Sequence, residues 1–282
     1  MPFSLVLNEA ATFKNAILSL KGFITTAVFY ITSQGLEITS QDANLLSMIE
    51  LNMPQAMFDT YSATQTYAFG VRIDLLATIV GYVRDNAKLE LYSDANDTDS
   101  ICLSSFDKAS SLMFSYKIKL VDTDPTHMPK QRYVAAVTMQ SVGWKAMVDS
   151  LADAGKDCLI IVTDPQLIMI SEREHLRKTS IMDANKHPSV TTFINALRPF
   201  SDTYLMEYLK HFSRHTALNQ VVRIRFTEKG LLCVTYLLGN SHDGSARGLS
   251  TNGHLTFVLS PVKSPETDSQ KLTESLENSK FF

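Results

Sequence analysis

The sequence lacks long apolar runs and has few cysteines. None of its apolar runs approaches the roughly 18 residues of a membrane-spanning helix, and residues 1–10 lack the basic start and apolar core of a signal peptide. The three cysteines, Cys102, Cys158 and Cys233, lie far apart, each in or beside an apolar run. We therefore expect a soluble, intracellular protein without a membrane partner, whose cysteines are reduced thiols in a core.

Catalytic motifs are also absent from the sequence. It contains no Walker phosphate loop, dinucleotide-binding glycine pattern, HExxH, paired CxxC or GxSxG turn. We accordingly predict no catalytic residues and no cofactor, and we do not expect an enzyme. The net charge of −3 argues against a generally basic nucleic-acid-binding protein, but it is compatible with a local basic surface on an acidic body.

Two groups of acids have the composition of a cation site. Asp94, Asp97 and Asp99 resemble part of a calcium loop, yet the glycine and closing glutamate of such a loop are missing at their required offsets. We predict a solvated hairpin turn there. Asp122 and Asp124 would chelate a cation only with additional ligands, so we interpret them as solvated acids of a linker.

Two histidines, His211 and His215, lie one helical turn apart, which is a spacing that can ligate a metal. No third ligand of suitable spacing accompanies them. The pattern favours an exposed helix face beside Lys210 and Arg214, and we predict no metal site.

Apolar residues at i, i+3, i+4 and i+7, which form one face of a helix, occur four times in the chain. The four stripes are Phe13, Ala16, Ile17 and Leu20; Leu76, Ile79, Val80 and Val83; Trp144, Met147, Val148 and Leu151; and Leu205, Tyr208, Leu209 and Phe212. The third stripe follows the first, and the fourth follows the second, at nearly the same interval of roughly 130 residues. This period predicts a duplicated chain with two helices in each half.

Short segments with alternating apolar and polar residues predict strands in both halves. They are 27–32, 35–40, 46–51, 66–72, 88–92, 101–105 and 112–120 in the first half, and 132–139, 158–162, 167–171, 177–182, 190–196, 220–227, 231–238 and 255–259 in the second. Leu36 follows Phe13 at the same interval at which Leu167 follows Trp144, so the strands repeat with the helices. We predict an α+β fold of two similar domains, each with two helices on antiparallel sheets.

The segment 120–137, LVDTDPTHMPKQRYVAAV, lies near the middle of the chain. Pro125 and Pro129 lack a backbone donor and favour an extended conformation in the residues before them, so we expect neither a helix nor an interior strand. We predict domains at 1–119 and 135–262, joined by a connector at 120–134. The composition also predicts a long hairpin loop at 239–252 and a disordered tail at 263–282.

Cations lie on or beside all four predicted helices. Those most suited to contact DNA are Lys14, Lys21, Arg72, Arg84, Lys145, Lys210 and Arg214. On a single helix such residues are typical of a solvated face, but four helices together predict a basic surface that would bind the nucleic-acid backbone without sequence preference.

Five sequence patches resemble the eukaryotic and archaeal sliding clamps of the proliferating cell nuclear antigen type. FKNAILSLKGF (13–23) is similar to the first helix of that family, and SQGLEITSQDANLLSMIELNM (33–53) to the strand, loop and strand that follow. LVDTDPTHMPKQRY (120–133) resembles the interdomain connector. GHLTFVLSP (253–261) is similar to the closing strand, and YLKHFSRHTAL (208–218) matches the last helix.

The resemblance implies the DNA clamp fold and a ring of three chains. Such a homotrimer would be joined head to tail by edge strands, with segment 112–120 of one chain beside 176–182 of the next, and twelve helices would line a pore around duplex DNA. It further implies a clamp loader, a DNA polymerase and other replication and repair proteins as partners, and a nuclear location, or a viral replication site if the source is a virus. Segment 239–252 is an insertion relative to the family.

The family also implies a pocket under the connector that receives partner peptides with paired aromatic residues. Carried over by position, this pocket comprises Gln41, Leu45, Met48, Met128, Pro129, Val258 and Pro261. A partner's aromatic pair would anchor the complex there. The chain itself contains Phe281 and Phe282 at the end of the predicted tail, which suggests docking of the tail in a clamp pocket as one hypothesis.

Several positions depart from the basic residues that the family carries on its helices. They are occupied by Thr78, Gly81, Ala146, Asp149, Asp153 and Glu207. A less positive pore leaves two alternatives to a homotrimeric clamp. One is a subunit of a heterotrimeric checkpoint clamp, and the other is a monomeric or dimeric processivity factor that holds DNA on an open basic face.

Overall fold

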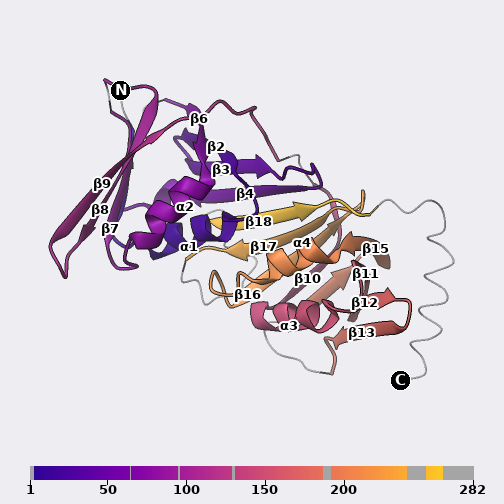
Figure 1. The fold of residues 1–282 in the computed structure, drawn as a ribbon. Helices are drawn as coiled ribbons and strands as arrows, with labels where there is room; N and C mark the ends of the chain where they lie inside the picture. Colours follow the sequence, from indigo (N-terminus) through magenta and orange to yellow (C-terminus); the bar gives the residue numbers. More distant parts are fainter. Residues whose placement is uncertain are drawn as a thin grey trace.

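The computed structural model describes residues 3–63, 65–94, 96–128, 131–186, 192–239 and 252–262. Within these ranges the chain has an α+β fold with four α-helices and three antiparallel sheets (Figure 1). The predicted loop at 239–252, apart from its ends, and the predicted tail at 263–282 lie outside the described residues.

The first half contains nine strands and two helices. They are β1 (Ser4–Leu7), α1 (Ala11–Leu20), β2 (Thr26–Thr32), β3 (Gly35–Gln41), β4 (Ser47–Pro54), the 3-10 turn η1 (Gln55–Met57), β5 (Thr60–Ser62), β6 (Tyr67–Arg72), α2 (Ile73–Tyr82), β7 (Lys88–Tyr92), β8 (Ser100–Asp107) and β9 (Leu112–Lys119).

The second half repeats this order, η1 excepted. Its elements are β10 (Tyr133–Gln140), α3 (Ser141–Leu151), β11 (Asp157–Thr163), β12 (Gln166–Arg173), β13 (Leu176–Asp183), β14 (Phe193–Ala196), β15 (Phe200–Leu205), α4 (Met206–Ser213), β16 (Val221–Thr227), β17 (Leu232–Leu237) and β18 (His254–Leu259). Each half therefore runs strand, helix, five strands, helix, three strands, which is the duplication that the sequence period indicates.

The sheets connect the two halves. Strands of the first half form the five-stranded sheet β5-β1-β7-β8-β9, and strands of the second form the four-stranded sheet β13-β12-β11-β15. The remaining strands form one nine-stranded sheet, β14-β10-β16-β17-β18-β4-β3-β2-β6, in which β18 of the second half pairs antiparallel with β4 of the first. The core is continuous across this junction, because one cluster of buried apolar residues includes both halves.

The four helices pack in pairs, α1 with α2 and α3 with α4, on the same side of the nine-stranded sheet (Figure 1). The predicted stripes of α1, α2 and α3 are all buried, because the 3.6-residue period directs them to the core. Of the predicted stripe of α4, Tyr208, Leu209 and Phe212 are buried within the helix, whereas Leu205 is the last residue of β15 and the helix begins at Met206. In the sequence, the first residues of α2 and α4, Ile73 and Met206, are about one helical turn further apart than the first residues of the two predicted stripes, Leu76 and Leu205.

The connector prediction requires one correction. β10 begins at Tyr133, so the last two residues of the predicted connector, 133 and 134, belong to a strand, as does the rest of segment 133–137. This strand is interior, because β10 pairs with both β14 and β16. The described residues 122–128 and 131–132 contain neither helix nor strand. The second proline, Pro129, lies outside the described residues.

Candidate functional surfaces

The seven cations predicted to contact DNA all lie on or next to the helices. Lys14, Lys145 and Lys210 are within helices, and Lys21, Arg72, Arg84 and Arg214 flank them. The helix face that carries them is only weakly basic, since the positions that depart from the family, Thr78, Gly81, Ala146, Asp149, Asp153 and Glu207, are all exposed.

Four of the seven cations form ion pairs within the chain. Arg72 pairs with Asp74, Arg84 with Asp107 and Lys145 with Asp149, and all three cations have substantially exposed side chains. Because these cations are exposed, each can exchange its carboxylate for a phosphate.

Lys14 differs from the exposed pairs because it has a structural role. Its side chain is only 17% exposed, and its Nζ donates to Asp85 at 2.9 Å and to the Val83 carbonyl at 2.7 Å, which joins α1 to the end of α2. Among the described residues, Lys21, Lys210 and Arg214 form no ion pair. These three are the cations most available to a polyanion.

Three residues of the predicted peptide pocket lie side by side on adjacent strands. Met48 of β4 is directly opposite Gln41 of β3 on one side and Val258 of β18 on the other. Gln41 is exposed, Met48 half-buried and Val258 buried, so the row passes from solvent into the sheet. Pro261 follows β18 directly, and the Ser260 amide donates to the Leu46 carbonyl at 2.9 Å, which brings the end of β18 beside the β3–β4 loop.

The β3–β4 loop presents Leu45, another described pocket residue, to solvent. Leu45 is 68% exposed and has φ of +59°, a conformation that a leucine rarely adopts. Asp42 supports this conformation: its carboxylate accepts from the Ser47 amide at 2.5 Å, the Asn44 amide at 3.1 Å and the Tyr208 hydroxyl at 2.7 Å. The loop is thereby held rigidly with an apolar side chain outward.

The connector runs across the nine-stranded sheet, where it is held by hydrogen bonds to β6 and β3. The Val121 amide donates to the Gly70 carbonyl at 3.0 Å, and the Thr39 hydroxyl donates to the Thr126 carbonyl at 2.6 Å. Gly70 is required at this crossing, since a Cβ there would lie 2.2 Å from the Val121 carbonyl oxygen. Thr39 is two residues from Gln41, so the connector passes directly beside the pocket row.

Met128, the sixth described pocket residue, is half-buried and follows the anchored part of the connector. His127 lies over Tyr30 of β2, with ring centroids 4.9 Å apart. Pro129 lies outside the described residues. Reasoning from sequence missed the anchors Thr39, Tyr30 and Asp42, although the Asp42-Ala43-Asn44 order is a typical turn signal.

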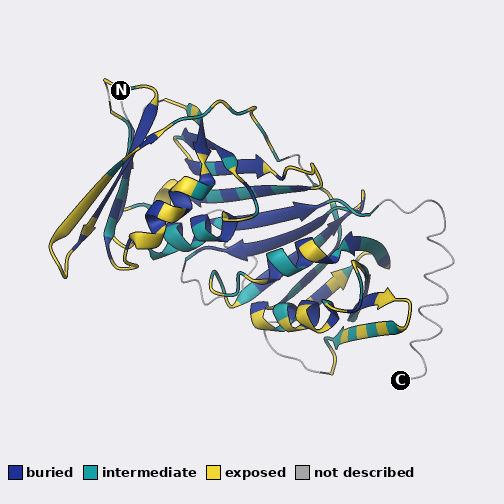
Figure 2. Cartoon of the chain, viewed as in Figure 1, coloured by how far each residue is buried: buried dark blue, intermediate teal, exposed yellow. Residues whose placement is uncertain are grey.

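Two of the six strands that end the three sheets, β9 and β13, are of interest for association. β9 ends the five-stranded sheet and β13 ends the four-stranded sheet, and each pairs on one side only within the described residues. Three consecutive apolar residues of β9 are exposed, Leu112 by 54%, Met113 by 69% and Phe114 by 46%. Figure 2 shows these two partly exposed strands at opposite ends of the molecule. An exposed apolar edge is a surface that favours pairing with another strand.

The sequence predicted an exposed helix face for His211 and His215, and this is wrong: His211, in α4, and His215, just after it, lie against Phe23 and Phe257, where the two halves of the chain meet. His211 stacks on Phe23 with ring centroids 4.5 Å apart, and His215 stacks on Phe257 at 5.2 Å. Burial, with Arg214 as a lesser cause, lowers the pKa of His211 to about 4. Burial, with lesser effects from His211 and Arg214, lowers the pKa of His215 to about 3. Both rings are therefore neutral at pH 7.

These pKa values predict a loss of stability in mild acid. Between about pH 6.5 and pH 4 the unfolded chain binds protons that the folded chain does not, so the free energy of unfolding falls as the pH falls. We expect a decrease of up to about 6 kcal/mol between pH 7 and pH 4 from this pair, reduced where water screens the partly exposed rings. His215→Phe keeps the stack and removes one proton site, so thermal unfolding followed against pH should show a smaller decrease than the wild type.

The matched control is His175→Phe, because the His175 side chain is 88% exposed. It should leave the pH dependence of the melting temperature unchanged. An unaltered profile in His215→Phe would contradict the assignment of the acid sensitivity to this cluster.

The remaining polar candidates are structural or solvated. Asp97 accepts from Lys117 at 2.6 Å and from Ser100 at 2.8 Å, which lowers the pKa of its carboxyl to about 2. Asp122 and Asp124 are exposed, as predicted. The described residues contain no group of three or more His, Cys, Asp or Glu side chains suited to a metal ion, and no helix among them is long and apolar enough to cross a membrane.

The three cysteines are buried and free, as predicted for core thiols. Burial raises the pKa of Cys158 to about 12. It is also the main cause that raises the pKa of Cys233 to about 11. Neither thiol forms a thiolate at neutral pH, so neither has the character of a reactive cysteine.

A comparison with protein families identifies the first half of the chain. Residues 2–127 match the model described as proliferating cell nuclear antigen, N-terminal domain. The match extends from the start of the chain through β1 to β9 and into the connector, and it ends one residue before Met128.

Proposed function

The first half of the chain is a proliferating cell nuclear antigen N-terminal domain, so the protein is a sliding clamp of that type, and from this premise we propose that it encircles duplex DNA as a homotrimeric ring. In this function it is a non-enzymatic tether. A DNA polymerase and other replication and repair proteins would bind at the connector, and a clamp loader would open the ring. Its place of action would be the nucleus, or a viral replication site.

The observation that supports ring closure is the internal junction between β18 and β4. By the repeated element order, β9 is the equivalent of β18, and β13 is the equivalent of β4. Within the chain, β18 thus pairs with β4, whereas the equivalent strands β9 and β13 do not pair with each other and lie at the ends of separate sheets. Head-to-tail association of copies would pair β9 with β13 and join five strands to four, which reproduces the nine-stranded sheet already present within each chain.

The internal junction also predicts the register between copies. Leu7 and Val137 each precede a helix by four residues, and successive pairings lead from Leu7 to Phe114 in the first half and from Val137 to Phe257 in the second. Phe114 is therefore the equivalent of Phe257.

On the other edge the same reasoning relates β4 to β13. Ser171 follows the Trp144 stripe at the same interval at which Ser40 follows the Phe13 stripe, so the two serines are equivalent. Ser40 pairs with Ile49, and Ser171 pairs with Lys178, which makes Ile49 and Lys178 equivalent as well. Since Phe257 pairs with Ile49 inside the chain, Phe114 of one copy would pair with Lys178 of the next.

A ring that is threaded on DNA needs only weak phosphate contacts, because its topology prevents dissociation. This agrees with a helix face on which Lys21, Lys210 and Arg214 are the available cations and four other cations are already paired. Sliding requires contacts that are independent of sequence and exchange easily.

The test is a DNA-release experiment. Protein loaded by its clamp loader onto nicked circular DNA should survive a high-salt wash, and cutting the circle with a restriction enzyme should then release it. Retention on the cut DNA would contradict encirclement. Changing Lys21, Lys210 and Arg214 together to glutamate should reduce loading at about 0.15 M salt at least about tenfold, whereas the same change at the exposed residues Arg132, Arg198 and Lys229 should have little effect.

The weak charge of the helix face favours a second candidate, a subunit of a heterotrimeric checkpoint clamp. A third arrangement, a monomeric or dimeric factor with an open DNA-binding face, follows if the edges do not pair. Sedimentation of the purified chain separates these possibilities: a homotrimer supports the first, and a monomer that remains monomeric at high concentration contradicts it.

A further inference from the structure

We propose that the chain has a second docking site for a protein segment, one with an aromatic anchor flanked by lysine or arginine, in a pocket between the five-stranded and nine-stranded sheets of the first half. The pocket has a volume of about 390 Å³ and opens where β1 starts, β7 ends and β6 starts. It is separate from the DNA-facing helices and from the groove beside the connector row of Gln41, Met48 and Val258.

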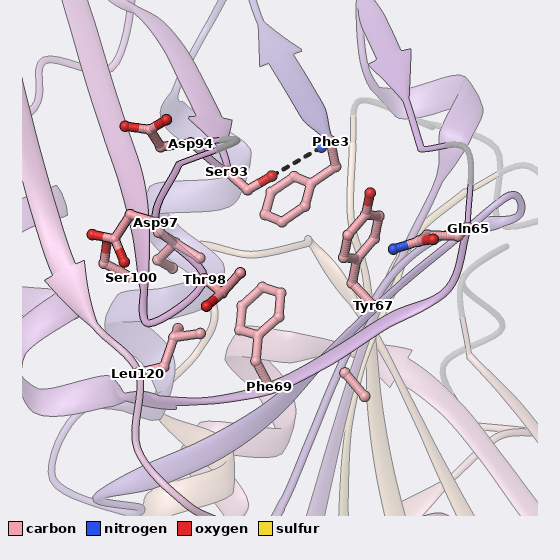
Figure 3. A pocket seen from close by; sticks show the side chains of 12 residues that line it. Phe3, Gln65, Tyr67, Phe69, Ser93, Asp94, Asp97, Thr98, Ser100 and Leu120 are labelled. Carbon is pink, nitrogen blue, oxygen red and sulfur yellow. Dashed lines mark hydrogen bonds between the residues drawn. The ribbon is translucent and has the colours of Figure 1, made fainter. Parts of the chain in front are cut away.

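Three aromatic rings form the floor of this pocket. Phe3 packs edge-on against Tyr67 at 5.1 Å between centroids and stacks parallel to Phe69 at 5.8 Å. The position of Phe3 is fixed by a hydrogen bond from its amide to the Ser93 hydroxyl at 3.0 Å (Figure 3). Phe3 is buried while Tyr67 and Phe69 are half-buried, so ring surface remains accessible to an occupant. The floor is rigid because it continues into the core.

The rim of the pocket is acidic on one side. Figure 3 shows Asp94, Asp97 and Thr98 on the side of the β7–β8 connection, with Gln65 on the opposite side. The exposed Asp94 forms no ion pair in the described part of the chain, while Asp97 is paired with Lys117. An occupant that buries an aromatic or large aliphatic group on the rings therefore finds a carboxylate beside it for a neighbouring cation.

The second half shows that this pocket is not a necessary feature of the fold. There the connection between β16 and β17 has four residues, 228–231, whereas seven residues, 93–99, connect β7 and β8. The short turn closes the equivalent space, because the Tyr204 hydroxyl donates to the Gly230 carbonyl at 2.7 Å. A Cβ at Gly230 would lie 2.3 Å from the Asp202 carboxylate, so this turn packs directly on β15.

The volume and lining limit the size of the occupant. A space of about 390 Å³ is at the small end of ligand pockets and suits one large side chain with part of its backbone. One buried aromatic anchor with flanking charges gives weak, reversible binding, which suits a contact that assists a second, stronger one.

The probe for this site is the peptide acetyl-Lys-Lys-Trp-Lys-amide, titrated into the full chain and followed by methyl NMR. We expect dissociation constants on the order of 1 mM or below, with shifts at Ile101 and Leu120, which line the pocket, and none at Val258 in the connector groove. The peptides with alanine in place of tryptophan, or glutamate in place of lysine, should bind at least about fivefold more weakly.

Two variants complete the test. Asp94→Lys should weaken binding about fivefold, and Thr98→Trp, which fills the pocket from its exposed rim, should abolish it. Glu228→Lys, the matched change at the closed turn of the second half, should alter the affinity less than about twofold. Absence of binding, shifts confined to the connector groove, or equal binding by Asp94→Lys and the wild type would each overturn the proposal. Because the readouts lie at Ile101 and Leu120, these results do not depend on ring formation.

Discussion

A chain in which Leu112 and Phe114 are both changed to lysine should sediment as a folded monomer. These two residues lie on β9 and are 54% and 46% exposed in the single chain, so the substitution costs little folding stability. Their equivalents in β18, Leu255 and Phe257, are fully buried at the internal junction with β4. Ring closure would bury Leu112 and Phe114 similarly. The burial of each side chain would stabilise each interface by roughly 1.5–3 kcal/mol.

Lysine at these positions removes that burial and brings an additional charge beside Lys178 of the next copy. The expected loss, summed over three interfaces, exceeds what a ring at micromolar concentration tolerates, so polymerase stimulation should fall at least about 100-fold. The matched control changes Phe193 and Leu197, in β14 and directly after it, to lysine, because these residues are 61% and 79% exposed. A monomeric control, or a lysine variant that remains trimeric, would contradict the proposed interface.

Cysteine cross-linking tests the register of the same interface. The pairing of Phe114 with Lys178 places Met113 opposite Thr179, within the Cα separation that a disulfide spans. Met113→Cys with Thr179→Cys should give covalent oligomers of up to three chains on oxidation. Met113→Cys with Arg177→Cys, displaced by two residues, should not. The background is low because the three native cysteines are buried.

The sequence predicts the fold well where one periodicity operates without competition. The stripes of α1, α2 and α3 are placed correctly, because a helix with one buried face has a distinct 3.6-residue period. The stripe of α4 is correct at Tyr208, Leu209 and Phe212, but its first residue, Leu205, is apolar and partly buried at the end of β15 and so extends the predicted helix backwards. β15 itself is missed, since Ser201, Asp202 and Thr203 interrupt the alternation that predicts a strand.

The candidate site is less predictable, because its properties depend on partners distant in sequence. The pattern places Lys14 correctly beside the first stripe. Its ion pair with Asp85, which follows α2 in the sequence, has no signal in the sequence. The burial of His211 likewise depends on Phe23 in the other half of the chain. Residues that a resemblance carries over by position can be located from sequence, but their charge state and their availability to a ligand require the structure.

The connector illustrates both outcomes. As its prolines predict, residues 122–128 contain neither helix nor strand, yet the predicted connector overlaps by two residues the strand that begins at Tyr133 and that the alternating pattern predicts at 132–139. Its fixation by the Thr39–Thr126 hydrogen bond is not predictable, since a hydroxyl and a carbonyl so far apart in the chain carry no pattern. This hydrogen bond fixes the connector beside the row of Gln41, Met48 and Val258, where the peptide pocket is predicted.

Changing Leu45 and Met128 together to aspartate should abolish the binding of partner peptides while the ring persists. Leu45 is exposed on a loop held by Asp42, and Met128 is half-buried after the anchored part of the connector, so both would be available to a peptide bound in the predicted pocket. Each would lose about 2 kcal/mol of apolar contact with a peptide and would oppose its burial with a charge. We expect at least about a 100-fold loss of affinity.

The measurement is fluorescence anisotropy with a labelled peptide that has a glutamine six residues, and an isoleucine three residues, before two adjacent phenylalanines. Phe193→Asp with Leu197→Asp is the control, since it adds the same charge at an exposed apolar pair in and beside β14, and it should bind as the wild type does. Sedimentation of the Leu45 and Met128 variant should give the wild-type mass, because neither residue belongs to β9 or β13. An unchanged peptide affinity in a correctly assembled variant would place the partner site elsewhere on the clamp. Loss of assembly would instead mean that the connector contributes to ring closure, which the β9–β13 junction does not require.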